Sequence, residues 1–228
     1  MGKLYIVATP IGNLSDITFR AIETLKSVSL VACEDTRHAG ILLKRYEITT
    51  PTLSFHSHSG EAKVEKVIEY LRRGQDVALI SDAGTPGISD PGYRLIRAAL
   101  DERIQVIPIP GATAAITALS ASGLPTDKFL YLGFLPVKHG RQTIFKMIAE
   151  SEHTVVFYES PHRLFKTLEQ LRGHLLPTAQ VVVAKELTKI YETFYRGTLE
   201  EVLAALPAGN PKGEYVVMIK CVRKGNQH

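Results

Sequence analysis

The segment Val77–Gly92 constrains the fold of this chain more than any other. Four apolar residues, Val77-Ala78-Leu79-Ile80, run directly into a loop of glycines, prolines and small polar residues that extends from Ser81 to Gly92. A short apolar run of this kind predicts a buried parallel strand. Because ligands of open α/β sheets bind beyond the carboxyl ends of the strands, the loop is a candidate binding site.

The chemistry of this loop argues against a polyphosphate ligand. Proline has no N–H group, so Pro86 and Pro91 weaken any cradle of backbone amides for phosphate. The sequence also contains neither G-x-G-x-x-G nor G-x-x-x-x-G-K-[ST]. The loop therefore predicts a compact ligand that is held by backbone carbonyls and small side chains.

The order of strand-like and helix-like segments predicts two domains, residues 1–111 and 112–228, with the boundary at Pro108-Ile109-Pro110-Gly111. The first domain is expected to be a parallel sheet flanked by helices, because its strands and helices alternate with short loops. Consecutive strands without helices make the second an α+β domain with a mixed sheet. The expected strands are 4–8, 29–33, 52–55, 77–80, 105–109, 129–134, 154–158, 180–185, 193–197 and 214–222. The expected helices are one capped by Ser15 or Asp16, then 61–73, 93–100, 112–122, 142–149, 161–171 with Ser160 as N-cap, and 199–206.

The composition is that of an ordinary globular protein, with 45% hydrophobic and 22% charged residues among 228. No apolar run approaches the ~20 residues of a membrane span, and the first strand begins too early for a signal peptide. We expect a cytoplasmic protein whose Cys33 and Cys221 are buried free thiols. Lys and Arg exceed Asp and Glu, 27 to 23, and the excess lies in the second half. This excess of positive charge is expected if the second half faces an anionic partner such as RNA. Ordinary solvated lysines explain it equally well.

Several strand ends of the first domain carry polar residues, at Thr9-Pro10, Glu34–His38, His56–Ser59 and Asp82–Ser89. Parallel strands share one edge, so these loops are expected to converge on a cleft that faces the second domain. There, Asp35 can deprotonate a substrate hydroxyl, or it can belong to a paired surface cluster with Arg37. His56 and His58 share one face of a strand, but no further ligand follows at a matching spacing, so we expect no metal site.

Two further candidates lie in the second half. Glu159, with His162 and Arg163, follows a strand and can either help to bind phosphate or cap the next helix. Lys185-Glu186 ends an apolar strand, where a buried ion pair is costly and thus suggests a function.

Five motifs together resemble the ribosomal RNA small subunit methyltransferase I family, within the class III, tetrapyrrole-methylase-like enzymes that use S-adenosylmethionine. The motifs are Leu4–Leu14, Cys33–His38, Ser81–Gly92, Pro110–Ala114 and Phe157–Arg163, in an order that runs over nearly the whole chain. The resemblance implies a homodimer of two-domain subunits, with the methyl donor in the interdomain cleft. It implies methyl transfer to the 2′-hydroxyl of a cytidine in the decoding region of 16S rRNA. Members often continue past the last strand, whereas this sequence ends at His228.

The resemblance assigns site residues by motif. The donor-binding set is Pro10, Asp82, Gly84, Thr85, Pro86, Ser89, Thr113, Ala114, Tyr158 and Gly213. For catalysis the motifs mark a neighbourhood and not the roles in it, and the candidates there are Asp35, Glu159, Lys185 and Glu186. Arg37 and Arg163, together with the basic excess of the second half, are our candidates for phosphate contacts with RNA. A sulfonium methyl is already activated, so the enzyme must mainly align the acceptor oxygen, and a base or cation near that oxygen helps.

The expected partner is the small ribosomal subunit rather than DNA or a membrane. Two other readings stay open: a class III methylase that acts on a small porphyrinoid-like molecule, and a non-catalytic rRNA-binding assembly factor. The absence of tryptophan and the modest aromatic content argue against the first of these, since a large ring needs stacking partners. The second predicts RNA binding without donor binding.

Overall fold

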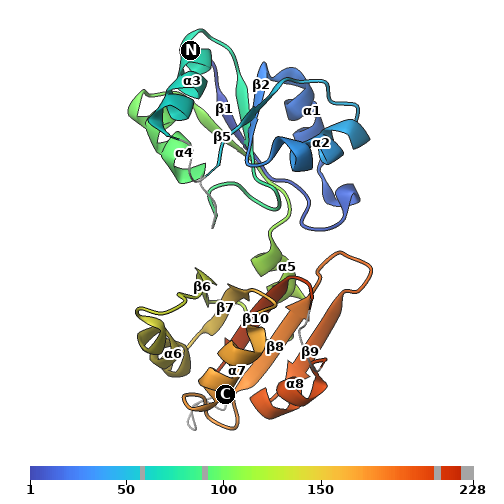
Figure 1. Ribbon diagram of the computed structural model, residues 1–228, viewed down its shortest axis with the longest axis vertical. Coiled ribbons are helices and arrows are strands. Elements are labelled where there is room, and N and C mark those ends of the chain that lie inside the picture. The colour runs from blue at the N-terminus through green and yellow to red at the C-terminus, as the bar shows by residue number, and fades with distance from the viewer. Residues whose placement is uncertain (57–59, 89–91, 208–211, 222–228) are drawn as a thin grey trace. The chain divides into compact units, whose positions relative to one another are not determined.

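The chain folds into two compact units, Met1–Thr113 and Ala114–His228. A computed structural model describes residues 1–56, 60–88, 92–207 and 212–221. The predicted boundary at residue 111 lies two residues from this division. Each unit has a five-stranded sheet of its own (Figure 1). His58 and Ser89, two residues of the predicted site loops, lie outside the described residues.

The sheet of the first unit is parallel throughout, as the sequence predicts, in the order β3-β2-β4-β1-β5. Its strands are β1 (Leu4–Val7), β2 (Leu30–Cys33), β3 (Thr52–Ser54), β4 (Val77–Ile80) and β5 (Val106–Ile109). All residues of β2 and β4 are buried. Strands buried on both faces are continuously apolar, which explains the run that precedes Ser81.

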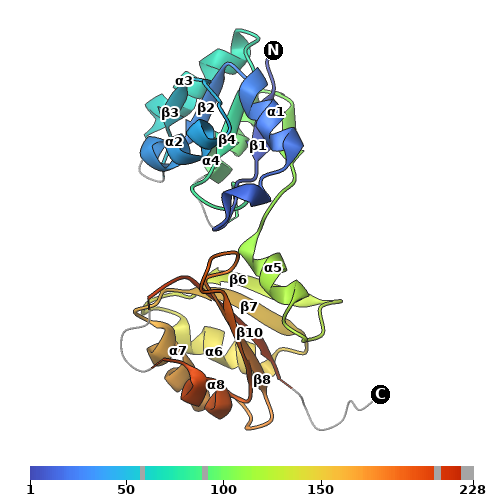
Figure 2. The same ribbon diagram turned by 90° about the vertical axis from the view of Figure 1, so that its right-hand side faces the viewer.

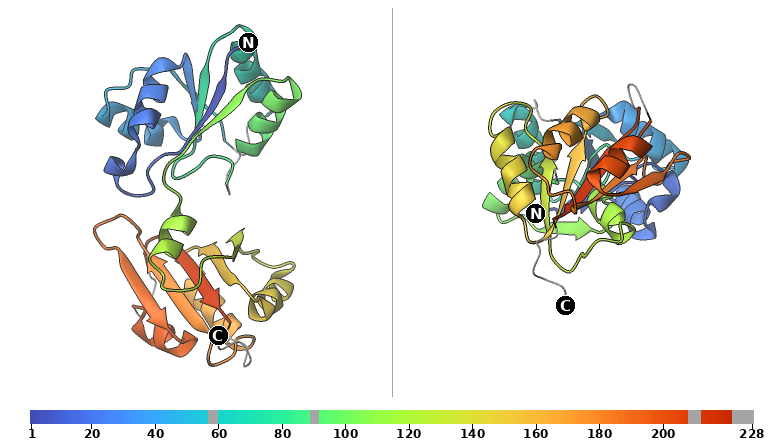
Figure 3. Two further views of the ribbon diagram at one scale, coloured as in Figure 1. Left: turned by 180° about the vertical axis from the view of Figure 1, so that it is seen from behind. Right: turned by 90° about the horizontal axis from the view of Figure 1, so that it is seen from below.

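Helices cover both faces of this sheet, α1 and α2 on one side and α3 and α4 on the other (Figures 1 and 3). Their bounds are α1 (Phe19–Ser27), α2 (Thr36–Arg45), α3 (Glu61–Arg72) and α4 (Gly92–Asp101), and a 3-10 turn, η1 (Leu14–Asp16), precedes α1. Leu25 and Val31 belong to the core on one side, and Ile68 and Leu79 to the core on the other.

Two local predictions in this unit are wrong. Ser15 and Asp16 do not cap α1, because they lie inside η1; Thr18 is the cap, and its Oγ1 accepts a hydrogen bond from the Ala21 N–H at 3.1 Å. The segment after β2 was expected to be a loop, but α2 begins there. Asp35 is its N-cap.

The second unit has the mixed sheet that the sequence predicts, in the order β6-β7-β10-β8-β9. Only β6 and β7 are parallel, and the other neighbouring pairs are antiparallel. The strands are β6 (Phe129–Phe134), β7 (Thr154–Glu159), β8 (Gln180–Lys185), β9 (Thr193–Gly197) and β10 (Tyr215–Lys220). Consequently β6, β7 and β8 all end at the same edge of the sheet, where β10 begins.

One face of this sheet packs against α6 (Arg141–Glu150), α7 (Leu164–Arg172) and α8 (Leu199–Ala205), and α5 (Ala114–Ser120) lies on the other face (Figure 2). The prediction that Ser160 caps a helix starting at Pro161 is wrong. The N–H groups of Arg163 and Leu164 both donate to the Ser160 carbonyl, which makes a separate turn before α7. Among the helices in the described part of the chain, none is long and apolar enough to cross a membrane.

Candidate functional site

The structure brings together the carboxyl ends of the central strands of the first unit. Thr9, which follows β1, and Gly84, in the loop after β4, exchange two backbone hydrogen bonds with N···O distances of 2.9 and 3.1 Å. The Thr9 hydroxyl also donates to the Ser81 carbonyl at 3.1 Å. The Thr85 hydroxyl donates to the carbonyl of Ala112, beyond β5, at 3.2 Å. The loop after β4 is therefore fixed by the segments that follow both β1 and β5.

Two glycines make this packing possible for different reasons. Gly84 has φ +81°, a left-handed conformation that other residues rarely adopt, while a Cβ there would meet Ile11 at an ordinary 3.5 Å. Gly111 does not have a left-handed φ, but a Cβ there would lie 2.8 Å from the Cβ of Ala8. The glycines of the predicted donor motifs thus serve a turn in one case and a close approach in the other.

A third strand end joins this edge through Asp82. Its carboxylate Oδ1 accepts a hydrogen bond at 3.1 Å from the backbone N–H of Asp35, which lies beyond β2. The Asp35 carboxylate in turn caps α2 by accepting the Arg37 N–H at 2.8 Å, and it also binds the Arg37 guanidinium. Hydrogen bonds from the Arg37 side chain and backbone hold the pKa of Asp35 well below its usual range. A carboxylate so stabilised is a weak base.

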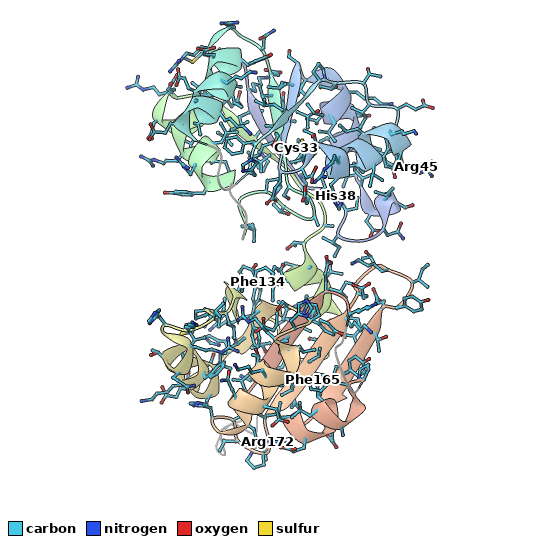
Figure 4. All side chains as sticks on the ribbon, viewed as in Figure 1. Cys33, His38, Arg45, Phe134, Phe165 and Arg172 are labelled. Carbon is cyan, nitrogen blue, oxygen red and sulfur yellow. The ribbon has the colours of Figure 1, made fainter. Side chains whose placement is uncertain are left out.

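Cys33 ends β2 immediately before these residues and is fully buried, as the sequence predicts (Figure 4). Burial, together with the carboxylates of Asp82 and Asp35, raises the pKa of its thiol to about 11. A thiol of such high pKa is a poor nucleophile at neutral pH. His38, labelled on α2 in the same figure, has an exposed side chain.

In the second unit, Tyr158 of β7 contacts the start of α5. Its hydroxyl accepts a hydrogen bond of 3.1 Å from the Ala115 N–H. The rings of Tyr131 and Phe134 meet the Tyr158 ring edge-on, with centroids 5.4 and 5.5 Å away. Tyr158 therefore orders the residue that directly follows Thr113 and Ala114, two predicted donor-binding residues.

Glu186 and Gly213 come from separate predictions, and the structure places them in contact. A Cβ on Gly213 would lie 2.9 Å from Cγ of Glu186. The Glu186 carboxylate accepts hydrogen bonds from the Glu214 N–H at 2.9 Å and from Lys189 Nζ at 3.0 Å. Burial opposes ionisation of Glu186, but these donors outweigh it and lower its pKa. Lys185, half-buried, precedes this turn at the end of β8.

Glu159 lies in the interior of the second unit, with 1% of its surface exposed. Its carboxylate accepts hydrogen bonds from the Ser160 N–H at 2.9 Å and the Thr167 hydroxyl at 2.6 Å. It also pairs with Arg163 at 3.2 Å and with Arg141 at 3.9 Å. These contacts match the requirements of a structural buried carboxylate.

Arg141 was not singled out from the sequence, although it completes this network. Its guanidinium donates to the Pro136 carbonyl, to Gln170 and to Thr167, at 2.8, 2.9 and 2.6 Å. The signal for it was weak, a single arginine at the start of a predicted helix. Lys189 was missed for a similar reason, because a lysine in a loop is usually solvated. In the part of the chain that the structure describes, no three His, Cys, Asp or Glu side chains gather as metal ligands do.

The fold and these loops define a class of protein. The sequence profile of the tetrapyrrole (corrin/porphyrin) methylases matches residues 3–203, and the chain belongs to that family. Two structures of uroporphyrin-III C-methyltransferase from Thermus thermophilus share the fold, with TM-scores of 0.68 and 0.64 at 23% and 18% identity. The alignments cover 96% and 95% of this chain and 94% and 97% of the others. The second of those structures is a complex with S-adenosylhomocysteine.

Within this family the chain falls among the proteins named ribosomal RNA small subunit methyltransferase I. It is 51% identical to the protein of that name from Synechocystis sp. over 96% of this chain and 79% of the relative. It is 49% identical to the one from Hydrogenobaculum sp. over 95% of each. The resemblance seen in the sequence motifs is thereby confirmed.

Proposed function

We propose that this protein is an S-adenosylmethionine-dependent methyltransferase that modifies the ribosomal RNA of the small subunit. The observation that carries the proposal is the near-half identity, over nearly the whole chain, to proteins named for that activity. Following the family resemblance, the acceptor is the 2′-hydroxyl of a cytidine in the decoding region of 16S rRNA. The protein works in the cytoplasm as a homodimer.

The proposed donor site comprises the two sets of loops described above. In the first unit the residues are Pro10, Asp82, Gly84, Thr85, Pro86 and Ser89, with Thr113. In the second they are Ala114, Tyr158 and Gly213. S-Adenosylmethionine carries a carboxylate, an ammonium group and no phosphate. A loop without lysine or arginine, in which prolines replace amide donors, suits such a ligand better than a nucleotide phosphate.

When bound, the donor supplies an activated methyl group on its sulfonium. The chain must then hold the ribose oxygen in line with the methyl carbon and stabilise the oxygen as its proton passes to water. We propose Lys185 for this electrostatic role, because an ammonium group at a strand end can stabilise a developing alkoxide. Glu186, engaged by Lys189 and Glu214, is proposed to fix the turn beside it. Glu159 and Asp35, tied to other partners, are proposed to act structurally rather than as bases.

The test is transfer of labelled methyl from S-adenosylmethionine to small ribosomal subunits purified from cells that lack this protein. The labelled nucleotide is then mapped. Label at a single ribose 2′-oxygen in the decoding region supports the proposal, and a Lys185→Met variant should then lose most of its kcat while it retains donor affinity. Donor binding without transfer to subunits, but with transfer to a porphyrinoid, favours the small-molecule reading. RNA binding without donor binding favours the assembly-factor reading.

A further inference from the structure

The Arg37 side chain is 89% exposed and yet pairs with a neighbouring carboxylate through two of its nitrogens. Its Nε and Nη2 donate to Oδ1 and Oδ2 of Asp35, at 3.1 and 2.6 Å. Exposed arginines usually sample many rotamers, and ordinary surface ion pairs contribute little. A bidentate pair between a planar guanidinium and a carboxylate is more specific, because it fixes an orientation as well as a distance.

The carboxylate that holds Arg37 is itself fixed at two further points. The Asp35 backbone N–H donates to Asp82 at the end of β4, and its Oδ1 accepts the backbone N–H of Arg37 at the start of α2. Arg37 is thus connected through hydrogen bonds to the same strand edge that carries the Thr9–Gly84 bridge. The contacts with Asp35 engage Nε and Nη2, and the guanidinium carries further N–H donors on Nη1.

We infer that Arg37 binds a backbone phosphate of the RNA substrate and that Asp35 is the positioning residue that orients its guanidinium. This inference rests on the proposed function, since it names a contact of the same substrate. The geometry of a guanidinium matches phosphate oxygens, and RNA presents such oxygens on both sides of an acceptor ribose. The lowered pKa of Asp35 agrees with this role, because a carboxylate that stays ionised remains an acceptor for the guanidinium of Arg37.

The Asp35→Asn variant separates positioning from the alternatives. Asparagine caps helices about as well as aspartate, so α2 should remain intact. If Asp35 were only a nearby negative charge, its removal would strengthen the binding of an anionic substrate. If it orients Arg37, the Kd for small subunits should instead rise about fivefold, equivalent to about 1 kcal/mol. Methyl transfer at saturating subunit concentration should keep its kcat and its pH profile.

Tighter binding by Asp35→Asn would overturn the inference. So would a large loss of kcat with an altered pH profile, since that result would make Asp35 a general base. The Kd is measured directly, without the donor, so the inference can be judged whether or not methyl transfer occurs.

The Arg37→Ala variant tests the phosphate contact itself. The slope of log Kd against log salt concentration should fall by about 0.7 to 1, the effect of losing one phosphate contact. Arg72 is the matched control, because its Nε and Nη2 also bind one carboxylate, that of Glu102. Arg72 ends α3 and Glu102 follows α4, so this pair lies at the opposite edge of the sheet.

Arg72→Ala should leave the salt slope unchanged. The phosphate assignment would be overturned if Arg37→Ala had the same salt slope as the unsubstituted protein. It would also be overturned if Arg37→Ala and Arg72→Ala reduced the salt slope by the same amount. A protein that binds subunits through Arg37 but transfers no methyl group would contradict the proposed function and uphold this inference. If the unsubstituted protein methylates subunits and the Arg37→Ala variant binds them with unchanged Kd and salt slope, this inference is contradicted and the proposed function stands.

Discussion

Thr9 and Gly84 form a short antiparallel bridge between the segments that leave two parallel neighbours, β1 and β4. Their paired hydrogen bonds, at 2.9 and 3.1 Å, turn the loop after β4 back against the first strand. The loop is therefore fixed to the sheet by hydrogen bonds and is not a free surface loop. A donor site built on it is largely pre-organised, which lowers the entropy cost of binding.

Replacing Gly84 by alanine should test that framework. The left-handed φ of +81° costs a residue with a Cβ about 1–2 kcal/mol, and relaxation of that angle would break the bridge to Thr9. We expect donor Kd, measured by calorimetry, to rise about tenfold. Gly74 is the matched control, since it has the same φ of +81° and nothing within 4 Å of its Cβ position.

Gly74→Ala should lose a similar amount of unfolding free energy in urea but keep the donor Kd. If both variants lose donor affinity to the same extent, general destabilisation rather than the Thr9–Gly84 bridge accounts for the effect.

Much of the first unit could be predicted because its strands β2 and β4 are buried throughout and therefore stand out as apolar runs. The start of α2 could not, because Asp35 and Arg37 look like a surface charge cluster in the sequence. Only the fold shows that Asp35 both caps the helix and is fixed by Asp82, a contact between residues 47 positions apart. Local patterns predict elements, whereas such long-range polar contacts decide what a candidate residue does.

Tyr158→Phe should weaken donor binding through α5. The change removes only the hydroxyl that accepts the Ala115 N–H, a hydrogen bond with a net contribution of about 1 kcal/mol. If that bond orders the predicted donor segment, the donor KM should rise about fivefold while kcat stays the same. Tyr191→Phe makes the same chemical change at a side chain that is 74% exposed, and it should alter neither constant. A Tyr158→Phe enzyme with an unchanged donor KM would remove Tyr158 from the site.

Glu159→Gln should destabilise the second unit without impairing the chemistry. Removing the charge leaves Arg141 and Arg163 without their buried partner, which typically costs about 3–5 kcal/mol. In the sequence, the position of Glu159 after a strand suggests phosphate binding or helix capping, and its carboxylate makes it a candidate base. The network with Thr167 and Arg141 is not visible there. Glu200→Gln is the control, because its exposed pair with Arg172 should contribute about 0–1 kcal/mol.

Urea denaturation of both variants measures this difference. The kcat of Glu159→Gln, corrected for the folded fraction, should match that of the unsubstituted enzyme. A stable Glu159→Gln protein with a large loss of kcat would instead restore Glu159 as a catalytic base.

The buried thiol of Cys33 should make the stability of the protein fall in alkali. Burial, with the nearby carboxylates, raises the pKa of Cys33 from 9.0 to about 11. Between these values the unfolded chain releases the thiol proton while the folded chain retains it, so the folded state loses stability as pH rises from 9 to 11. Tyr215, whose pKa is raised by burial from 10.0 to about 12, adds a second loss at higher pH. The free energy of unfolding of Cys33→Ala, followed by urea titration, should therefore fall less between pH 9 and pH 10 and keep the later loss. If Cys33→Ala and the unsubstituted protein lose stability identically with pH, the pKa of the thiol is the same in the folded and the unfolded chain.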